Sequence, residues 1–318
     1  MRKYTAFFVI LLITALFPSC IAESQVITIN ADGSITPSTT SIFQIGGAYF
    51  LAKDITQSVW IYKSNITFDG NAHCISGGTL DILNTSNVTV RNLTIMNTYQ
   101  GISIADSSGV TIINNTVAET GASLPFSETW AISIERGNSS AIVENNFIDN
   151  MVGLALLETH DNRIIGNNIT NCSSFAFGFY NSSENQIFHN NLVNNSVQYY
   201  DWGIGSYPYM QSRNLWDNGF FSGGNYWSDY QTRYPNAAMI GTSGIGNTPY
   251  TIDPQNKDRY PLMEPYHTVP AEASNSSTDL PAPSQELSPT TVAVVLGASA
   301  AAIVAIVCLA IYFKKRRR

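Results

Sequence analysis

The sequence predicts an all-β fold, a right-handed parallel β-helix built from coils of about 22 residues, followed by one C-terminal transmembrane α-helix. Three observations lead to this expectation. A short run of β-branched residues ending in Asn recurs at near-constant spacing, the connecting segments are rich in Asn, Ser and Gly, and a charge-free apolar run closes the chain. Alternating β-branched residues between turn formers indicate short strands and exclude helical repeats.

The N-terminal residues 1–22 are expected to be a signal peptide. Arg2 and Lys3 precede an apolar run over residues 7–17, and Ala22 ends a small-residue site suited to cleavage. Residues 23–63 should then form an N-terminal cap and the first coil, because an uncapped solenoid would expose the unpaired edges of its strands.

The repeats occupy residues 64–214. Their landmarks, the residues that end one strand of each coil, are positions 70, 92, 114, 145, 167, 190 and 214, so the steps are 22, 22, 31, 22, 23 and 24. Strands this short can pair only with those of the next coil, about 4.8 Å away. The long step predicts a protruding loop of about nine extra residues between Thr120 and Trp130.

Asn recurs directly after a strand in successive coils. This residue tolerates the left-handed backbone conformation of a corner, and its amide can bond to equivalent amides above and below. We therefore expect a structural ladder in which one amide stacks on the next: Asn92, Asn114, Asn145, Asn167 and Asn190.

Four further segments are expected after the coils. Residues 215–267 should cap the solenoid, and residues 268–290, rich in Pro, Ser and Thr, should form a flexible stalk. Residues 291–313 are long enough to cross a bilayer. The positive-inside rule then predicts that the basic tail 314–318 lies in the cytoplasm and the β-helix outside the cell.

The expected partners follow from these segments and from the charge. A single C-terminal span makes the cell membrane the first partner, and Gly297 and Ala301 have the spacing of helix faces that self-associate. Between Glu23 and Glu286, nine basic residues stand against 23 acidic ones, a net charge of −14. Such a surface repels phosphate backbones, so no nucleic-acid partner is expected.

Carboxylates near successive strand ends support an enzymatic hypothesis. Polysaccharide hydrolysis, elimination or epimerisation needs acid and base groups on one exposed wall. The candidate catalytic residues are Asp106, Glu135 and Glu158. The sequence contains neither an Asp-Asp pair nor a Gly-His-Gly motif of the kind found in β-helix enzymes, so solvated turn carboxylates are the alternative interpretation.

Candidate ligand-binding residues flank the predicted loop and the late aromatic residues. Glu119, Glu128 and Trp130 lie at or beside the loop, and loops on rigid scaffolds often carry binding residues. Tyr180 belongs to a group of aromatic residues near the end of the repeats, where an outward ring would stack on a sugar. The alternative is that these rings form an apolar plug.

Neither a disulfide nor a metal site is expected. Cys74 and Cys172 lie four coils apart, about 19 Å by strand spacing, whereas bridged Cα atoms lie within about 7 Å. The four His residues form no spaced motif, so neither a metal nor a cofactor is predicted. Among eleven Asn-Xaa-Ser/Thr sequons, Asn138, Asn181 and Asn275 are the preferred glycosylation candidates, being in two turns and the stalk.

Two sequence features resemble one known family. The coil beginning Ser64-Asn-Ile-Thr-Phe-Asp-Gly-Asn-Ala-His73 resembles the NosD-like β-helix repeats of bacterial and archaeal surface proteins. The segments Ser222–Tyr230 and Tyr260–Met263 are similar to the C-terminal cap of archaeal members, so the resemblance covers residues 40–266. It implies the fold more strongly than an activity. Relatives often carry two Asp residues where residues 242–247 have none, which weakens a calcium site.

The leading functional hypothesis is a membrane-anchored extracellular β-helix protein that binds envelope or extracellular glycans or surface-layer components. The alternative is a carbohydrate-active enzyme of the lyase, hydrolase or epimerase type, acting through the carboxylate wall. A more remote alternative, implied by the family resemblance, is a copper-site maturation factor.

Overall fold

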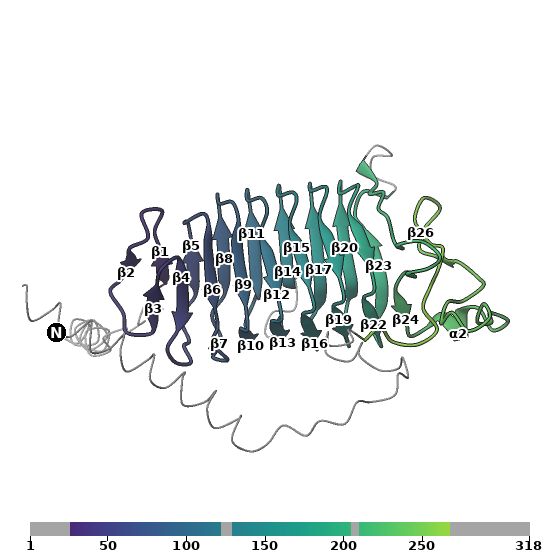
Figure 1. Cartoon of the computed structure of the whole chain (residues 1–318), viewed down its shortest axis with the longest axis horizontal. Helices are drawn as coiled ribbons and strands as arrows, with labels where there is room; N and C mark the ends of the chain where they lie inside the picture. Colours follow the sequence, from purple (N-terminus) through teal and green to yellow (C-terminus); the bar gives the residue numbers. More distant parts are fainter. Residues whose placement is uncertain (1–25, 122–128, 205–209, 268–318) are drawn as a thin grey trace, which may run out of the picture. The chain divides into compact units, whose positions relative to one another are not determined.

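The computed structural model describes residues 26–121, 129–204 and 210–267. All described residues belong to one compact unit. They form an all-β, right-handed solenoid of stacked coils (Figure 1).

No helix in the described part is long and apolar enough to span a membrane. The predicted signal peptide, stalk, transmembrane helix and basic tail lie outside the residues that the structure describes, and so does Asn275.

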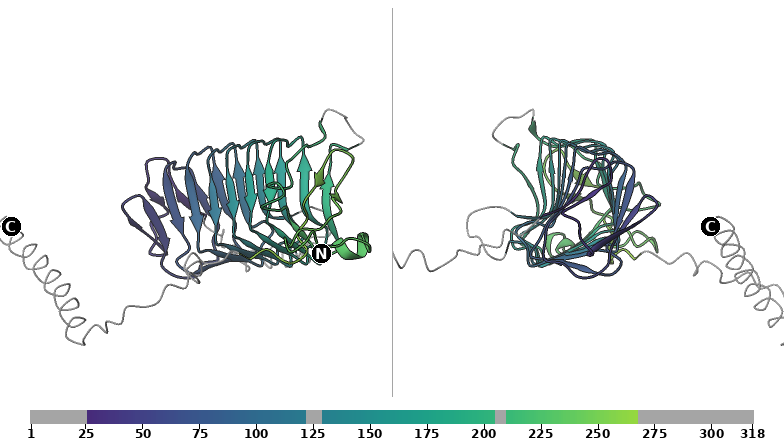
Figure 2. Two further views of the ribbon diagram at one scale, coloured as in Figure 1. Left: turned by 45° about the vertical axis from the view of Figure 1, so that its right-hand side comes forward. Right: turned by 90° about the vertical axis from the view of Figure 1, so that its left-hand side faces the viewer.

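Three parallel sheets, here called A, B and C, enclose the core, and a full coil adds one strand to each in that order (Figure 2). Sheet A contains β2 (Ile35–Thr36), β1 (Ile27–Ile29), β5 (Val59–Ile61), β8 (Leu80–Leu83), β11 (Ile102–Ala105), β14 (Trp130–Glu135), β17 (Val152–Leu157), β20 (Phe175–Tyr180) and β23 (Val197–Asp201). Sheet B contains β3 (Ile42–Ile45), β4 (Ala48–Leu51), β6 (Ile66–Asp69), β9 (Val88–Arg91), β12 (Thr111–Ile113), β15 (Ala141–Val143), β18 (Arg163–Ile165) and β21 (Gln186–Phe188). Sheet C contains β7 (Cys74–Ser76), β10 (Thr94–Met96), β13 (Thr116–Ala118), β16 (Asn146–Ile148), β19 (Asn168–Thr170), β22 (Asn191–Val193) and β24 (Tyr226–Trp227).

The two ends of the solenoid depart from this parallel pattern. At the N-terminal end, β1 pairs with β2 and β3 pairs with β4 in antiparallel fashion. Beyond β24 the chain adds the short helix α2 (Tyr230–Arg233) and an antiparallel pair, β25 (Tyr250–Thr251) and β26 (Lys257–Asp258). These elements lie against the first and last coils, where strand edges would otherwise be open.

Stacked aliphatic side chains form the core. Alternation along a strand turns every second residue inward, and the coil spacing places equivalent residues directly above one another. In sheet B the register stacks five residues that are fully buried: Val90, Ile112, Ile142, Ile164 and Ile187. The β-branched repeat seen in the sequence is therefore one wall of the core.

The strand register corrects the expected spacing of the repeats. Ile102 of β11 lies opposite Ile132 of β14, so the long step is 30 residues and not 31. The expected value was wrong because it matched Asn114 with Asn145, whereas Ile113 pairs with Val143 and Asn114 therefore aligns with Glu144.

The corner between sheets B and C contains a buried Asn ladder that differs from the expected one. Its members are Asn115, Asn145, Asn167, Asn190 and Asn225, each at most 1% exposed. In each pair, the side-chain oxygen of one Asn accepts the backbone N–H of the Asn in the preceding coil at 2.9–3.0 Å.

Asn92 and Asn114 are not in this ladder, so their assignment to it was wrong. Both are exposed and have positive φ angles of 53° and 55°. The corner needs two residues: the first takes the left-handed conformation in solvent, and the second turns its amide inward. Leu93 and Asn115 occupy the second position in these coils, and the backbone N–H of Leu93 donates to Asn115.

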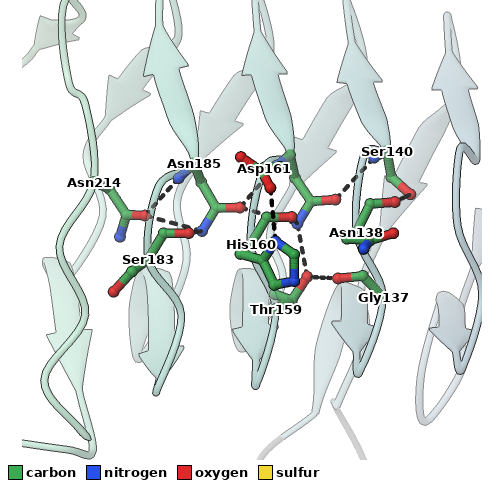
Figure 3. A network of polar contacts seen from close by, with 10 residues as sticks. Gly137, Asn138, Ser140, Thr159, His160, Asp161, Ser183, Asn185 and Asn214 are labelled. Carbon is green, nitrogen blue, oxygen red and sulfur yellow. Dashed lines mark hydrogen bonds and ion pairs between the residues drawn. The ribbon is translucent and has the colours of Figure 1, made fainter. Parts of the chain in front are cut away.

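A second ladder lies at the corner between sheets A and B. It runs through Ser140, Asn162, Asn185 and Asn214, and the side-chain oxygen of each Asn accepts the backbone N–H of the residue before it at 2.9–3.0 Å (Figure 3). The N–H of Asn214 donates in turn to Asn256 of the cap at 2.9 Å. Asn214, the last landmark, therefore belongs to the corner between sheets A and B. In the corner between sheets B and C, the residue that follows Asn190 is Asn225.

The Gly224-Asn-Tyr-Trp227 motif joins the cap to the last coil. Asn225 extends the first ladder, and the Trp227 indole N–H donates to the buried carboxylate of Asp258 at 2.8 Å. Gly224 is required by space, because a Cβ there would lie 1.9 Å from an Asp258 oxygen. Trp227 also stacks on Tyr250, with ring centroids 4.1 Å apart, and so closes the end of the core.

Candidate functional site

The turn between sheets A and B forms one exposed wall of the solenoid. In the five turns from β8–β9 to β20–β21 it contains two residues with positive φ, and their side chains are exposed except at Gly109. The first of these positions forms a column in which charged residues predominate: Asn84, Asp106, Arg136, Glu158 and Asn181. The wall therefore carries both signs of charge.

The three candidate catalytic residues do not form one column. Asp106 and Glu158 share the column just described, with Arg136 between them, whereas Glu135 lies one residue earlier, in register with Ala105 and Leu157. The expected alignment of all three was therefore wrong for Glu135. The error arose because Arg136, and not Glu135, occupies the left-handed position that follows the strand.

Arg136 neutralises the carboxylates on this wall. Its Nε and Nη2 atoms donate to the two oxygens of Asp106 at 2.8 and 3.0 Å, and Nη1 donates to Glu135. The Arg136 guanidinium lowers the pKa of the Asp106 carboxyl, which stays ionised at neutral pH. Asp106 therefore lacks the raised pKa that a general acid needs.

A shallow hollow of about 260 Å³ lies on the same wall. Its lining includes Asp106, Arg136, Glu158 and His160. The ring Nδ1 of His160 bonds to Asp161 at 2.7 Å, while Thr159 beneath it bonds to Gly137 and Asn162 inside the turn (Figure 3). The hollow presents charged groups on a rigid base, but its arginine is already held by two carboxylates.

The outer face of sheet A carries a second, longer row of side chains. Its register aligns seven outward residues from β5 to β23: Trp60, Asp81, Ser103, Ser133, Ala155, Gly178 and Tyr200. The first four are polar or amphipathic, and Gln100 donates to Ser133 at 3.0 Å beside them. In the middle of the row Ser133, Ala155 and Gly178 are buried, and Tyr200 at its C-terminal end is exposed again.

Asp81 is the functional candidate in this row that sequence reasoning missed. It is half-buried on the outer face, next to Trp60, and accepts a hydrogen bond from Thr79. Burial raises the pKa of the Asp81 carboxyl above its ordinary value. The sequence offered one signal for it: Asp81 is an acid between two apolar residues, Leu80 and Ile82, that point inward.

Three aromatic rings cluster at the C-terminal end of the row. Phe175 and Tyr200 stack with centroids 4.6 Å apart, and Trp202 meets them edge-on at 6.2 and 5.5 Å. A Cβ at Gly178 would lie 2.5 Å from the Trp202 ring, so glycine lets this ring lie close to the sheet. Tyr200 is 43% exposed, which leaves part of the cluster open to solvent.

The predicted ligand-binding residues are dispersed. Glu128 lies outside the described residues, and Glu119 is exposed at a corner between sheets C and A. Trp130 is half-buried on β14, opposite Val152. The Tyr180 hydroxyl donates a hydrogen bond to Met210 at 3.0 Å. The aromatic cluster on the outer face is formed by Phe175, Tyr200 and Trp202.

The two glycosylation candidates in the described part, Asn138 and Asn181, both lie in the turn between sheets A and B.

The described residues bring together no group of three or more His, Cys, Asp and Glu side chains that could hold a metal ion. His73 bonds to Asp54 at 3.2 Å, and His189 bonds to the carbonyl of Ser222 at 2.7 Å. Both Cys74 and Cys172 are free thiols, and burial raises the pKa of Cys172 to about 12.

Comparisons with known proteins identify a family. The model of the NosD family, described as a periplasmic copper-binding protein, matches residues 24–232. Comparison with curated proteins gives no match. Two solved structures that match are a mutant of the periplasmic alginate epimerase AlgG (TM-score 0.38, 11% identity, 50% of this chain and 40% of that one) and the enzymatically active domain of bacteriophage CBA120 tailspike protein 2 (0.37, 13%, 55% and 26%).

PfbA, a surface adhesin of Streptococcus pneumoniae, also matches, with a TM-score of 0.31, 13% identity and coverage of 56% of this chain and 59% of that one. In the two alignments given above, the chain spans less than half of the epimerase mutant and of the tailspike domain.

Proposed function

The chain belongs to the NosD family, and from the outer face of its β-helix we propose that it binds extracellular or envelope polysaccharide at the cell surface. One observation carries the proposal: Trp60, Asp81 and Ser103 on the outer face of sheet A lie in line with a partly exposed aromatic cluster at its C-terminal end, formed by Phe175, Tyr200 and Trp202. Aromatic faces stack on the apolar faces of sugars, while hydroxyl and carboxyl groups bind their hydroxyls.

The length of the row favours an extended ligand. From Trp60 to Tyr200 it crosses six coil steps, about 29 Å at the strand spacing. Both end residues are exposed aromatic rings, at 37% and 43% of their surface. A linear polymer laid along the solenoid axis would contact the two end rings and the half-buried Asp81 and Ser103, and would pass over the buried Ser133 and Ala155.

The location proposed for this activity is outside the cytoplasm. The family description is periplasmic, and the sequence supports export through residues 1–22 and membrane anchoring through residues 291–313. Held in this way, the β-helix would face the polymers of the envelope.

Copper binding, which the family description names, does not fit the described residues. Copper sites need several His, Cys or Met ligands around one point. Here His160 bonds to Asp161, His189 bonds to Ser222, and the buried Cys172 thiol has a raised pKa, in separate parts of the solenoid. No step through copper follows from this arrangement.

The test of the proposal is a glycan array with the full-length protein in detergent micelles, followed by affinity electrophoresis in each polysaccharide that binds. We expect Tyr200→Ala to weaken retention about tenfold, because it removes a stacking ring. Phe221→Ala is the matched control, since Phe221 is a fully exposed aromatic residue of the cap. Retention of no polysaccharide, or an equal loss in both variants, would refute the proposal.

A second function, polysaccharide cleavage or epimerisation, is favoured by Asp81 alone. A half-buried carboxyl with a raised pKa beside an aromatic ring is suited to general-acid chemistry. We expect Asp81→Asn to abolish any formation of new reducing ends or unsaturated uronates, and Glu135→Gln to preserve it. Product formation that depends on Glu135 and not on Asp81 would contradict this assignment.

A further inference from the structure

A groove of about 580 Å³ lies where the last coil meets the C-terminal cap. The solenoid contributes residues 194–199, which include the start of β23. The cap supplies the facing wall: Ser228, Asp229, Thr232, Arg233, Tyr250 and Ile252. The lining is rich in amides and hydroxyls and contains one acid and one base.

Arg233 is held in place without a carboxylate partner. Its guanidinium carbon lies 4.6 Å from the centroid of the Tyr250 ring, and Tyr250 is itself fixed by stacking on Trp227. Arg233 is exposed and makes no ion pair within the part of the chain that the structure describes. Stacking occupies the face of a guanidinium and leaves the N–H groups on its edge for a ligand.

Asp229 is fixed on the same wall. The Tyr250 hydroxyl donates to it at 2.9 Å, and Gln198 Nε2 donates to it at 3.4 Å from the opposite wall. Asn195 in turn donates to Gln198 at 3.2 Å. A carboxylate has about four acceptor positions, so Asp229 retains capacity for the hydroxyl groups of a ligand.

We propose that this groove binds a sugar that carries one carboxylate, a hexuronate, with Arg233 pairing its carboxylate and Asp229 accepting its hydroxyls. A neutral sugar would leave the stacked arginine unpaired. A doubly charged phosphate would be repelled by Asp229, whose carboxylate shares the groove with Arg233. A singly charged polyhydroxy acid satisfies both residues.

The binding test uses full-length protein in detergent micelles and isothermal titration calorimetry with three probes: glucuronate, glucose and inorganic phosphate. We expect glucuronate to bind at least about tenfold more tightly than glucose, because an arginine–carboxylate pair is charge-assisted and bidentate. We also expect it to bind more tightly than phosphate. Equal binding of glucose and glucuronate, tighter binding of phosphate, or no binding would each overturn the proposal.

Variants locate the site. Arg233→Gln should weaken glucuronate binding about tenfold or more, and Arg233→Lys should give an intermediate affinity, because lysine keeps the charge but loses the planar fork. Arg163→Gln is the matched control, since Arg163 is an exposed arginine on β18 of sheet B. Unchanged affinity in Arg233→Gln, or an equal loss in Arg163→Gln, would place the site elsewhere. Thermal unfolding checks that the variants are folded.

The groove and the outer face of sheet A are separable. Tyr200 and Trp202 do not line the groove, so Tyr200→Ala should leave glucuronate affinity unchanged. Loss of polysaccharide retention in Tyr200→Ala together with normal glucuronate binding would support two independent sites. Loss of glucuronate binding in Tyr200→Ala would contradict a groove centred on Arg233.

Discussion

The solenoid and its C-terminal cap are stabilised in different ways. In the coils the same contacts recur, so that Asn145, Asn167 and Asn190 each make nearly the same hydrogen bonds to the coil before them. In the cap the contacts are single: Asp258 alone accepts from Asn225, Trp227 and Tyr260. Because their contacts repeat, the coils can be predicted from the sequence. The contacts of the cap do not repeat along the described chain, so no pattern in the sequence predicts them.

The difference extends to function. Within the coils, outward residues inherit the spacing of the repeat, so functional groups there form rows along the axis, as on sheet A. At the cap the chain leaves the repeat and encloses a groove in which Arg233 and Asp229 lie on one wall. The two proposals therefore assign a long polymer to the solenoid and a single sugar unit to the cap.

The largest effect is expected in the buried ladder. Asn145→Ala would remove the acceptor for the Asn115 N–H and the donor to the Ile112 carbonyl, both inside the core. Buried groups left unpaired cost about 1–3 kcal/mol each, so we expect a loss of about 3 kcal/mol or more. Thermal unfolding followed by circular dichroism measures this loss.

Asn114→Ala is the matched control for that experiment. Asn114 is exposed at the left-handed corner position, and Ala adopts this conformation at a cost of about 1–2 kcal/mol. A loss in Asn114→Ala equal to or larger than that in Asn145→Ala would show that the ladder runs through Asn114 after all.

Strand existence and coil order were predictable because they depend on local patterns. The β-branched alternation around Val90 and Ile112 is visible in the sequence, and these residues are stacked in the core. The register at the corner was not predictable, since Asn114 and Asn115 are adjacent residues of the same type. Only the pairing of neighbouring strands decides which of them turns inward.

The site was harder to predict because its residues depend on which way each side chain points, and the spacing of residues in the sequence does not give that. Glu135 and Arg136 are neighbours in the sequence, yet only Arg136 takes the left-handed corner position. Asp81 was overlooked because a single acid in a strand carries no motif. The groove brings residues 194–199 against Arg233 and Tyr250, and no repeat relates these segments.

An effect that depends on pH is expected in the cap. Burial raises the pKa of Asp258 to about 7, from an ordinary value of 3.8. The native state therefore holds this proton more tightly than the unfolded state, and stability should decline as the pH rises from about 4 to about 7. Asp217, paired with Arg259, adds to the upward shift of this pKa.

Asp258→Asn should lower the free energy of unfolding by about 2 kcal/mol, because the new amide NH₂ faces one of the three donors. It should also remove this part of the pH dependence of stability. The measurement is the unfolding temperature of the wild type and the variant at pH 4.5, 6 and 8. Parallel curves for the two proteins would show that Asp258 does not titrate in this range.

The smallest effect is expected on the exposed wall between sheets A and B. Arg136→Gln removes the ion pairs to Asp106 and Glu135, but all three side chains lie close to half exposed, where water and salt screen such pairs. We expect no measurable change in unfolding temperature, while the pKa of Asp106 rises toward its ordinary value in a carboxyl NMR titration. A large fall in unfolding temperature would mean that this wall, like the ladder beneath it, is structural, and would leave the face of sheet A and the cap groove as the surfaces free to bind ligands.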